Sequence, residues 1–268
     1  MSLLRVRDLV VEARSESKIV QAVNHVDFEI GESEVVGLIG ESGSGKTTLV
    51  RSILDLLERN VRITNGSIEY SGNTMVDVAT GHSELGPIRG SQIGMVFQSP
   101  RSSLDPLMTI GGHLREVLRR HKPGITRDEV RTRSIEVLGE MGLEAERVMR
   151  SYPHQLSGGM CQRAAIAIAI APYPSLLIAD ECTSALDVTS QEEVVKVLKH
   201  LTEHRKMALI FVTHDMLLAS ELCDRLVVMQ NGKVVESGTT AQILGDPRED
   251  YTKQLIAAVP RWTTEGNA

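Results

Sequence analysis

The residues from Gly40 to Thr47 carry the spacing G-x-x-x-x-G-K-[ST]. Glycines in such a loop let consecutive backbone N–H groups point at one anion, because they have no Cβ atoms in the way. The Lys46 ammonium adds a point charge for a terminal phosphate, and the Thr47 hydroxyl is an oxygen ligand suited to Mg²⁺. The segment predicts a phosphate-binding loop, whose expected contact residues are Gly40, Ser42, Gly43, Ser44, Gly45, Lys46, Thr47 and Thr48.

The elements on either side of this loop must hold it in place. Residues 34–39 form a short apolar, β-branched run typical of a buried strand, and residues 48–54 carry apolar side chains at helical spacing. A helix that starts at the loop adds roughly half a positive charge at the phosphate site. A chance Gly/Ser-rich turn would match the spacing alone, but the strand–loop–helix context favours a nucleoside triphosphate site.

Two acidic residues end a second apolar run, at residues 175–181. The run predicts a parallel strand, and the carboxyl ends of parallel strands face the ligand crevice of an α/β sheet. Asp180 is then expected to hold Mg²⁺ beside the phosphate loop, and Glu181 to activate a water molecule as a general base. Alone, the pair would be explained better as solvated acids at a strand end; the phosphate loop favours the functional interpretation.

A second glycine turn stands at residues 156–163, before an alanine-rich helix. Ser157 is a good N-cap, and Gly158 with Gly159 would leave the helix start open to an anion. The alternative is an ordinary helix that is capped by serine and entered through glycines. Together with Gly40 to Thr47, the sequence thus offers two candidate phosphate turns that are far apart in the chain.

The hydrophobic pattern predicts an α/β fold with a helical insert. Short strands are expected at 3–11, 26–30, 35–39, 67–70 and 92–97, with turns at 65–66 and 71–73. From residue 158 onward helices and strands alternate, with helices to 171, at 188–201 and at 216–223, and strands at 175–179, 208–212, 226–229 and 234–235. This alternation predicts a mostly parallel sheet with helices on both faces, interrupted by a helical segment at 99–155.

Composition narrows the function classes. A net charge of −6, a pI near 5.8, no dense Lys/Arg block and 3% aromatic residues argue against a nucleic-acid partner. The longest apolar run, residues 164–171, is far shorter than the roughly twenty residues of a membrane helix. The N-terminus lacks the layout of a secretion signal, and three cysteines without metal-ligand spacing are expected to be reduced thiols in a cytosolic protein. A role at a membrane is therefore expected to depend on partner proteins.

Taken together, these motifs resemble the ATP-binding subunits of ABC transporters, and the resemblance covers almost the whole chain. Six motifs occur in the family's order: Walker A at 40–48, the Q-loop glutamine Gln98, the signature at 156–162, Walker B at 176–180 with the catalytic Glu181, the D-loop at 184–187, and the switch histidine His214.

In such proteins two ATPase subunits bind head to tail, and each ATP lies between one subunit's phosphate loop and the other's signature turn. The resemblance implies that Ser157, Gly158 and Gly159 contact the γ-phosphate held by a partner chain. It also implies that Asp187 of the D-loop contributes to the nucleotide site.

The same resemblance assigns roles around the γ-phosphate. Gln98 is expected to contact Mg²⁺ or the attacking water, and His214 to contact the γ-phosphate and orient Glu181. Without this context His214 would be an ordinary turn histidine. The implied catalytic set is Glu181, His214 and Gln98; the implied Mg²⁺ ligands are Thr47, Gln98 and Asp180, with ATP as the nucleotide.

The resemblance also implies a domain plan: a P-loop NTPase (RecA-like) core at 1–98 and 156–268, with an N-terminal antiparallel β subdomain. A helical subdomain is inserted at 99–155, and a C-terminal helix is expected near 249–258. Because Gln98 stands at the entry to the insert, it is placed to link nucleotide state to whatever the insert touches.

Three segments resemble the oligopeptide/dipeptide/nickel importer branch: residues 97–106, residues 152–155 with Met160, and residues 251–260. This branch implies a second ABC ATPase, most simply in a heterodimer, two membrane-spanning permease subunits and an extracytoplasmic solute-binding protein. The chain would then be peripheral on the cytoplasmic face of the membrane. The solute stays open among a peptide, nickel, a metal chelate and an opine-like compound.

Two other functions are considered. A soluble single-domain ABC ATPase that acts in assembly rather than transport has the same motifs, but the importer-like insert disfavours it. A catalytically inactive regulatory subunit is disfavoured because Glu181 and His214 are present.

Three departures from the family pattern stand out. Residues 11–14 lack the aromatic that usually stacks on adenine, which leaves the choice between ATP and GTP open. Cys182 occupies the position of a usual proline, where inert packing is expected. No cysteine follows Cys223, so we expect no iron–sulfur cluster of the kind that cysteine-rich tails of some peptide-type relatives hold.

Overall fold

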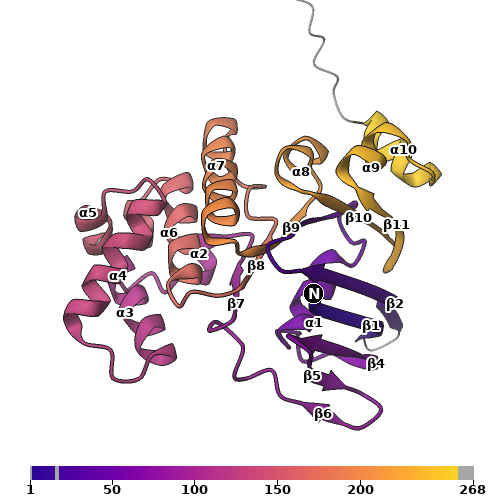
Figure 1. Ribbon diagram of the computed structural model, residues 1–268, viewed down its shortest axis with the longest axis horizontal. Coiled ribbons are helices and arrows are strands. Elements are labelled where there is room, and N and C mark those ends of the chain that lie inside the picture. Colours follow the sequence, from indigo (N-terminus) through magenta and orange to yellow (C-terminus); the bar gives the residue numbers. More distant parts are fainter. Residues whose placement is uncertain (1, 16–17, 259–268) are drawn as a thin grey trace, which may run out of the picture.

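A computed structural model describes residues 2–15 and 18–258 of the chain as two β-sheets flanked by helices (Figure 1). The first sheet is antiparallel, with strand order β2-β1-β4-β5-β6. Its strands are β1 (Ser2–Arg14), β2 (Ile19–Gly31), β4 (Val61–Tyr70), β5 (Asn73–Asp77) and β6 (His82–Ser83).

The second sheet has six strands in the order β11-β10-β3-β9-β8-β7. All neighbours pair in parallel except β10 and β11, which form an antiparallel hairpin. The strands are β3 (Val35–Ile39), β7 (Ile93–Val96), β8 (Leu176–Asp180), β9 (Ala208–Thr213), β10 (Arg225–Gln230) and β11 (Lys233–Thr239). Every residue of β3, β8 and β9 is buried, which explains their continuous apolar sequences.

The two faces of this parallel sheet bury two separate cores, because side chains alternate along each strand. In β9, Leu209 and Phe211 belong to one core, whereas Ile210 and Val212 belong to the other. The first core is closed by α6 (Gly158–Ile170), α7 (Val188–Arg205) and α8 (Met216–Leu222). The second is closed by α1 (Lys46–Ile53) and by the antiparallel sheet.

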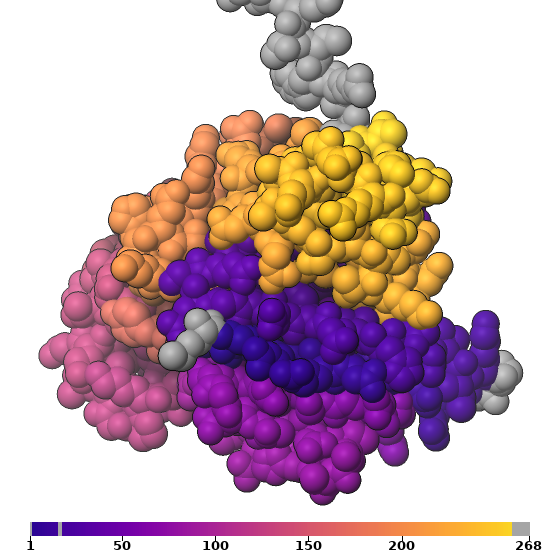
Figure 2. All heavy atoms as spheres, turned by 45° about the vertical axis from the view of Figure 1, so that its right-hand side comes forward, coloured from indigo at the N-terminus to yellow at the C-terminus, as the bar shows by residue number. Residues whose placement is uncertain are grey.

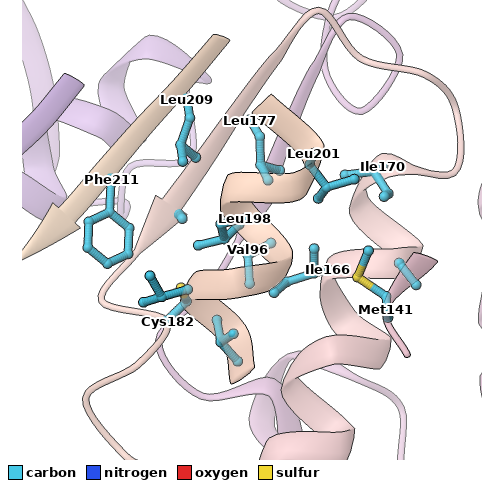
Figure 3. Close-up of a cluster of buried hydrophobic side chains, with 14 of the residues drawn as sticks. Val96, Met141, Ile166, Ile170, Leu177, Cys182, Leu198, Leu201, Leu209 and Phe211 are labelled. Carbon is cyan, nitrogen blue, oxygen red and sulfur yellow. The ribbon is translucent and has the colours of Figure 1, made fainter. Parts of the chain in front are cut away.

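Figure 3 shows part of the first core. Leu177 and Phe211 point from the sheet toward Leu198 and Leu201 of α7, and Ile166 and Ile170 of α6 lie on the far side of that helix. All six side chains are fully buried. Burial on this scale fixes the strand ends to which the candidate site residues are attached.

Between β7 and α6 the chain is helical, as the periodicity of residues 110–141 predicts. The helices are α2 (Pro100–Ser103), α3 (Ile110–His121), α4 (Arg127–Glu140), α5 (Ala145–Arg150) and a short 3₁₀ turn, η1 (Pro153–Gln155). Thr109 and Thr126 cap α3 and α4 through their side-chain oxygens, and Glu129 completes a capping box. Figure 1 places α3, α4 and α5 on the far side of α6 and α7 from the antiparallel sheet.

After β11 the chain forms α9 (Thr240–Gly245) and α10 (Asp250–Ala257). The C-terminal elements pack over the N-terminal strands, as Figure 2 shows in yellow and indigo. The helix expected near 249–258 is present, while residues 259 and 260 of the same sequence motif lie outside the described part. Within residues 2–15 and 18–258, no helix has the length and apolarity needed to span a membrane.

The predicted fold class is confirmed, but one turn was wrong. Residues 65–66 do not join two strands; they lie inside β4, where the pairing with β1 shifts register and Gly66 adopts φ +98°. The Asn65 side chain donates to the Asp8 carbonyl and carboxylate, so this pair forms a β-bulge rather than a turn. The Asn65-Gly66 pair correctly indicates a left-handed backbone conformation at the glycine, but the chain does not reverse its direction there.

Arg133 ties the inserted helices to the core. Its guanidinium, almost wholly buried, donates from Nε to the Ala171 carbonyl at 2.9 Å and from Nη2 to the Ile170 carbonyl at 3.1 Å. These carbonyls lie at the end of α6. The Ile170 carbonyl also accepts a hydrogen bond from the Tyr173 N–H at 3.0 Å, whereas Arg133 is the donor to the Ala171 carbonyl. Nη1 also lies 2.8 Å from the Glu136 carboxylate.

Replacing Arg133 by Met is expected to lower the free energy of unfolding by about 2–3 kcal/mol, since the Ala171 carbonyl would lose its donor and the Ile170 carbonyl one of its two donors. Urea denaturation of the full chain measures this. Arg131→Met is the control, because Arg131 pairs with Glu146 in solvent and its loss should leave the urea midpoint unchanged. Equal midpoints for both variants would contradict the role given to Arg133.

Candidate functional site

The carboxyl ends of three parallel strands meet at one edge of the six-stranded sheet. Ile39 of β3 pairs in register with Thr213 of β9, and Asp180 of β8 pairs with Val212. The segments that follow these strands, which contain Gly40, Glu181 and His214, therefore leave the sheet at the same edge.

The phosphate loop runs from β3 into α1. Gly45 is the N-cap residue of α1 at φ +103°, and a Cβ atom there would lie 2.4 Å from the Ala22 carbonyl oxygen. The loop can follow this path only with glycine, since both the backbone conformation and the close approach exclude a side chain. Ser42 and Gly43 are exposed, Ser44 is buried and Thr48 half-buried.

Lys46 folds back over the loop that precedes it. Its Nζ donates to the carbonyls of Gly40 at 2.7 Å and Glu41 at 2.8 Å, and lies 3.4 Å from the Ser44 hydroxyl. Burial lowers the pKa of the Lys46 ammonium, and nearby carboxylates, Glu181 most of all, oppose that shift. The loop thus holds a buried cation at its centre.

Asp180 contacts the loop directly. The Thr47 hydroxyl donates to Asp180 Oδ1 at 2.9 Å, and Arg51 Nε lies 3.9 Å from Oδ2. Burial raises the pKa of this carboxyl group, while the Thr47 hydrogen bond and the Arg51 charge act in the opposite direction. A hydroxyl and a carboxylate side by side form the hard oxygen donor set that suits Mg²⁺.

Glu181 follows β8 in a strained conformation, with φ +47°. Its N–H donates to the Val212 carbonyl at 3.0 Å, which fixes it to the end of β9. Gln98 Nε2 donates to Glu181 Oε2 at 3.0 Å and to the Ser184 hydroxyl at 3.3 Å. Positive φ in a non-glycine residue at such a position is typical of functional sites.

His214 is exposed directly after β9, at the same edge. Among the residues that the structure describes, no hydrogen bond joins it to Glu181; Gln98 makes that contact instead. Its role in orienting Glu181 stays a prediction.

The second glycine turn has the predicted local structure. Ser157 caps α6 by accepting a hydrogen bond from the Met160 N–H at 3.2 Å, and Gly158 is exposed at the helix start. Gly159 is buried against α7, where a Cβ atom would lie 2.7 Å from the Ser190 hydroxyl. Asp187 caps α7 by accepting from Ser190 N–H, so the signature turn and the D-loop form one contact region.

The two phosphate turns do not come together within the chain. The loop at Gly40 to Thr48 opens α1, which packs on one face of the parallel sheet, whereas Ser157 opens α6, which packs on the other. No hydrogen bond links the two turns in the described ranges 2–15 and 18–258. The two turns therefore lie at separate places on the molecule.

Sequence reasoning missed two contacts of the site. Arg51 was not assigned, although its position four residues after Thr47 places both on one face of α1, near Asp180. Tyr251 of α10 accepts a hydrogen bond from the N–H of Glu41 in the phosphate loop, and no sequence pattern near either residue predicts this contact. Cys182 is fully buried, and burial raises the pKa of its thiol to about 12, which fits the expected inert packing.

A phosphate loop at the start of a helix, next to a buried aspartate and a glutamate at the end of a neighbouring parallel strand, defines a P-loop nucleoside triphosphatase. More specifically, the profile of the ABC transporter family matches residues 23–184, and the chain belongs to this family.

Individual relatives support the same conclusion. The chain is 41% identical to an oligopeptide transport ATP-binding protein, AmiE, of Streptococcus pneumoniae, over 97% of this chain and 73% of the relative. It is 42% identical to a putative peptide import ATP-binding protein of Brucella abortus, over 96% and 77%. It is 43% identical to a peptidoglycan transport ATP-binding protein, YejF, of Agrobacterium fabrum, over 97% of this chain and 47% of the longer relative.

Solved structures agree. A dimeric, post-hydrolysis ATP-binding cassette, MJ0796, bound to ADP and Pi has 32% identity and a TM-score of 0.77, covering 88% of this chain and 98% of its own. The protein cbiO1 of Clostridium perfringens, part of the ABC transporter complex cbiONQ, has 26% identity and a TM-score of 0.75, covering 91% of each chain. The predicted family, fold and ATP hydrolysis are confirmed, and the comparisons support a transporter subunit rather than a soluble assembly ATPase.

The contact between Gly159 and Ser190 yields a direct test of how the second turn is built. Gly159→Ala is expected to lower the free energy of unfolding by about 1–3 kcal/mol, because the added Cβ overpacks the α6–α7 contact. Gly158→Ala is the control, since its Cβ would meet only Leu186 at 3.5 Å. Urea denaturation of both variants measures the two free energies of unfolding. Equal values would refute the close packing of Gly159 against Ser190.

Proposed function

We propose that the chain is the ATPase subunit of an importer for a peptide-class solute, held at the cytoplasmic face of a membrane by permease subunits. Relatives at 41–43% identity are named for oligopeptide, peptide and peptidoglycan transport, which supports this solute class over nickel or a metal chelate. An extracytoplasmic solute-binding protein completes the proposed complex.

The observation that carries the proposal is the convergence of four side chains at one sheet edge. Thr47 contacts Asp180, and Gln98 contacts Glu181, although the members of each pair are far apart in the sequence. We assign the terminal phosphates of ATP to the loop from Gly40 to Thr48, with Lys46 as their charge partner.

Mg²⁺ fits the hydroxyl of Thr47, the Asp180 carboxylate and the amide oxygen of Gln98, and when bound it would neutralise charge on the phosphate oxygens. The hydrogen bond between Thr47 and the buried Asp180 supports this role. The Arg51 guanidinium, 3.9 Å from the second carboxylate oxygen, would favour the charged form of Asp180 against the effect of burial, which raises its pKa.

Glu181 is the proposed general base. It would take a proton from a water whose oxygen bonds to the γ-phosphorus, as the bond from phosphorus to the ADP oxygen breaks. Gln98, already bonded to Glu181, would hold the carboxylate and the water in one arrangement. His214, exposed at the same edge, would contact the γ-phosphate.

Because the two phosphate turns lie on opposite faces of the sheet, we propose a head-to-tail dimer. Ser157, Gly158 and Gly159 would contact the γ-phosphate held by the partner, and Asp187 beside them would line the same interface. The dimeric state of the ATP-binding cassette among the structural neighbours supports a dimer. A second, different ATPase is the proposed partner, as in the importer branch that the sequence resembles.

We divide the chain into a core at 1–98 and 156–268 and an inserted helical subdomain at 99–155. Gln98 is the last residue before the insert, and its hydrogen bonds to Glu181 and Ser184 join the insert's entry to the catalytic edge. A shift of Glu181 on hydrolysis of the γ-phosphate would thus be transmitted through Gln98 to the inserted helices, which we propose to face the permease.

Glu181→Gln is expected to reduce ATP turnover of the assembled complex by at least about 10²-fold, because the amide cannot accept the proton of the attacking water. ATP affinity should be unchanged, since Glu181 is not proposed to hold the nucleotide. Phosphate release and calorimetric titration measure the two quantities separately.

Glu192→Gln serves as the matched control, because Glu192 is an exposed residue of α7 outside the site. Both its turnover and its affinity should equal those of the wild type. Unchanged turnover in Glu181→Gln would falsify the assignment of the base.

The transporter complex is tested by isolating the chain from its native membranes in mild detergent. Recovery of two multi-span proteins and a second ATPase supports the proposal. Recovery of a soluble partner alone would overturn it, together with the coupling role given to Gln98.

A further inference from the structure

The C-terminal helix α10 is fixed to the core at both its start and its side. The Glu236 carboxylate of β11 accepts hydrogen bonds from the N–H groups of Arg248 at 2.8 Å and Glu249 at 3.2 Å. Thr252 is fully buried, and Leu255 packs against the first core. This helix therefore has a defined position relative to the sheet.

Tyr251 links helix α10 to the phosphate loop through a hydrogen bond. Its ring packs against the first core, and its hydroxyl accepts a hydrogen bond from the Glu41 N–H at 3.0 Å. The two residues are separated by 210 positions in the sequence. Of the described residues outside the loop, Tyr251 is the one that hydrogen-bonds the Glu41 N–H.

The peptide unit at the other end of this contact also binds the loop lysine. The carbonyl of Gly40 and the N–H of Glu41 belong to one planar peptide group. That carbonyl accepts a hydrogen bond from Lys46 Nζ at 2.7 Å. The ammonium, the peptide and the tyrosine hydroxyl thus form a chain of hydrogen bonds, in which each bond polarises the next.

We propose that Tyr251 is a positioning residue of the phosphate-binding loop: it fixes the Gly40–Glu41 peptide in the orientation that holds the Lys46 ammonium in place. The proposal rests on the assignment of Lys46 to the phosphates of ATP under the proposed function. Tyr251 touches no reacting atom, so it acts on nucleotide affinity and not on the chemical step.

Tyr251→Phe in the full chain removes the hydroxyl and keeps the ring that packs on the core. We expect Kd for ATP to rise about fivefold, the effect of one hydrogen bond, and KM to rise with it. The value of kcat should stay within about twofold, because the machinery of hydrolysis is untouched. Amide exchange at Glu41 should accelerate as its N–H loses its acceptor.

Tyr173→Phe is the matched control. Tyr173 also hydrogen-bonds through its hydroxyl, to Glu136, but it lies just after α6, where its ring contacts Arg133 and Arg205 rather than the phosphate loop. Its substitution should leave Kd, KM and the exchange of Glu41 unchanged. Thermal unfolding of both variants shows whether a loss of affinity arises from destabilisation.

The outcomes separate this proposal from the proposed function. Weak binding by Lys46→Ala with normal Kd and normal Glu41 exchange in Tyr251→Phe overturns the role of Tyr251 and leaves the site intact. Normal binding by Lys46→Ala overturns the site itself. If Tyr251 acts through Lys46, Tyr251→Phe should weaken ATP binding much less in the Lys46→Ala background than in the wild type; equal effects in both backgrounds would contradict the proposal.

Discussion

The hydrogen bond from the Thr47 hydroxyl to Asp180 joins the two halves of the site. It connects the start of α1, on one face of the parallel sheet, to the end of β8. A carboxylate as buried as Asp180 is costly unless charges and donors surround it, and Thr47, Arg51 and the Lys46 ammonium supply them. The position of every other proposed catalytic group is defined relative to this contact.

The parallel sheet makes this contact available. β3 and β8 are not neighbours; β9 lies between them, and its register aligns Ile39 and Asp180 at one edge. Glu181 is then anchored to β9 by its own N–H, which leaves its side chain beside Gln98. A shift of one residue in either pairing would turn Asp180 away from the loop.

The opposite faces of the same sheet explain why the two proposed phosphate turns of one chain do not meet. α1 and α6 are packed into different cores, and both cores are tightly buried, so no modest motion brings Ser157 to the phosphate loop. In the proposed dimer, a second subunit would supply its Ser157 to the nucleotide that the first subunit holds. The contact of Gly159 with Ser190 places the D-loop at that same surface.

Much of the site was predictable from local patterns. Three features combine a specific set of residues with a neighbouring apolar pattern that predicts the adjoining strand or helix. They are the phosphate loop, the two acids at the end of β8 and the Ser157 cap. The fold followed because buried parallel strands have continuous apolar sequences. The bulge at Gly66 was mistaken for a turn, because glycine at positive φ serves both structures equally well.

Contacts between segments that are distant in the sequence could not be predicted from local patterns. The family resemblance named Gln98 and Glu181 as site residues but did not predict the hydrogen bond between them, since it gave the orientation of Glu181 to His214. Tyr251 has the spacing of an ordinary helix residue. Such pairs depend on how β7, β8 and α10 are placed in three dimensions. The weak strands β5 and β6 were missed for a related reason, since they are short, polar and stabilised by pairing with their neighbours.

The most direct measurement is the affinity of the ATP-bound chain for Mg²⁺ in Asp180→Asn, by calorimetric titration, with the exposed Asp128→Asn as control. Asparagine keeps the shape of the side chain and an acceptor for Thr47, but it removes the negative charge. If Asp180 and Thr47 form the metal site, Mg²⁺ affinity falls at least about tenfold in Asp180→Asn and stays unchanged in Asp128→Asn. Wild-type Mg²⁺ affinity in Asp180→Asn would contradict this arrangement of the site.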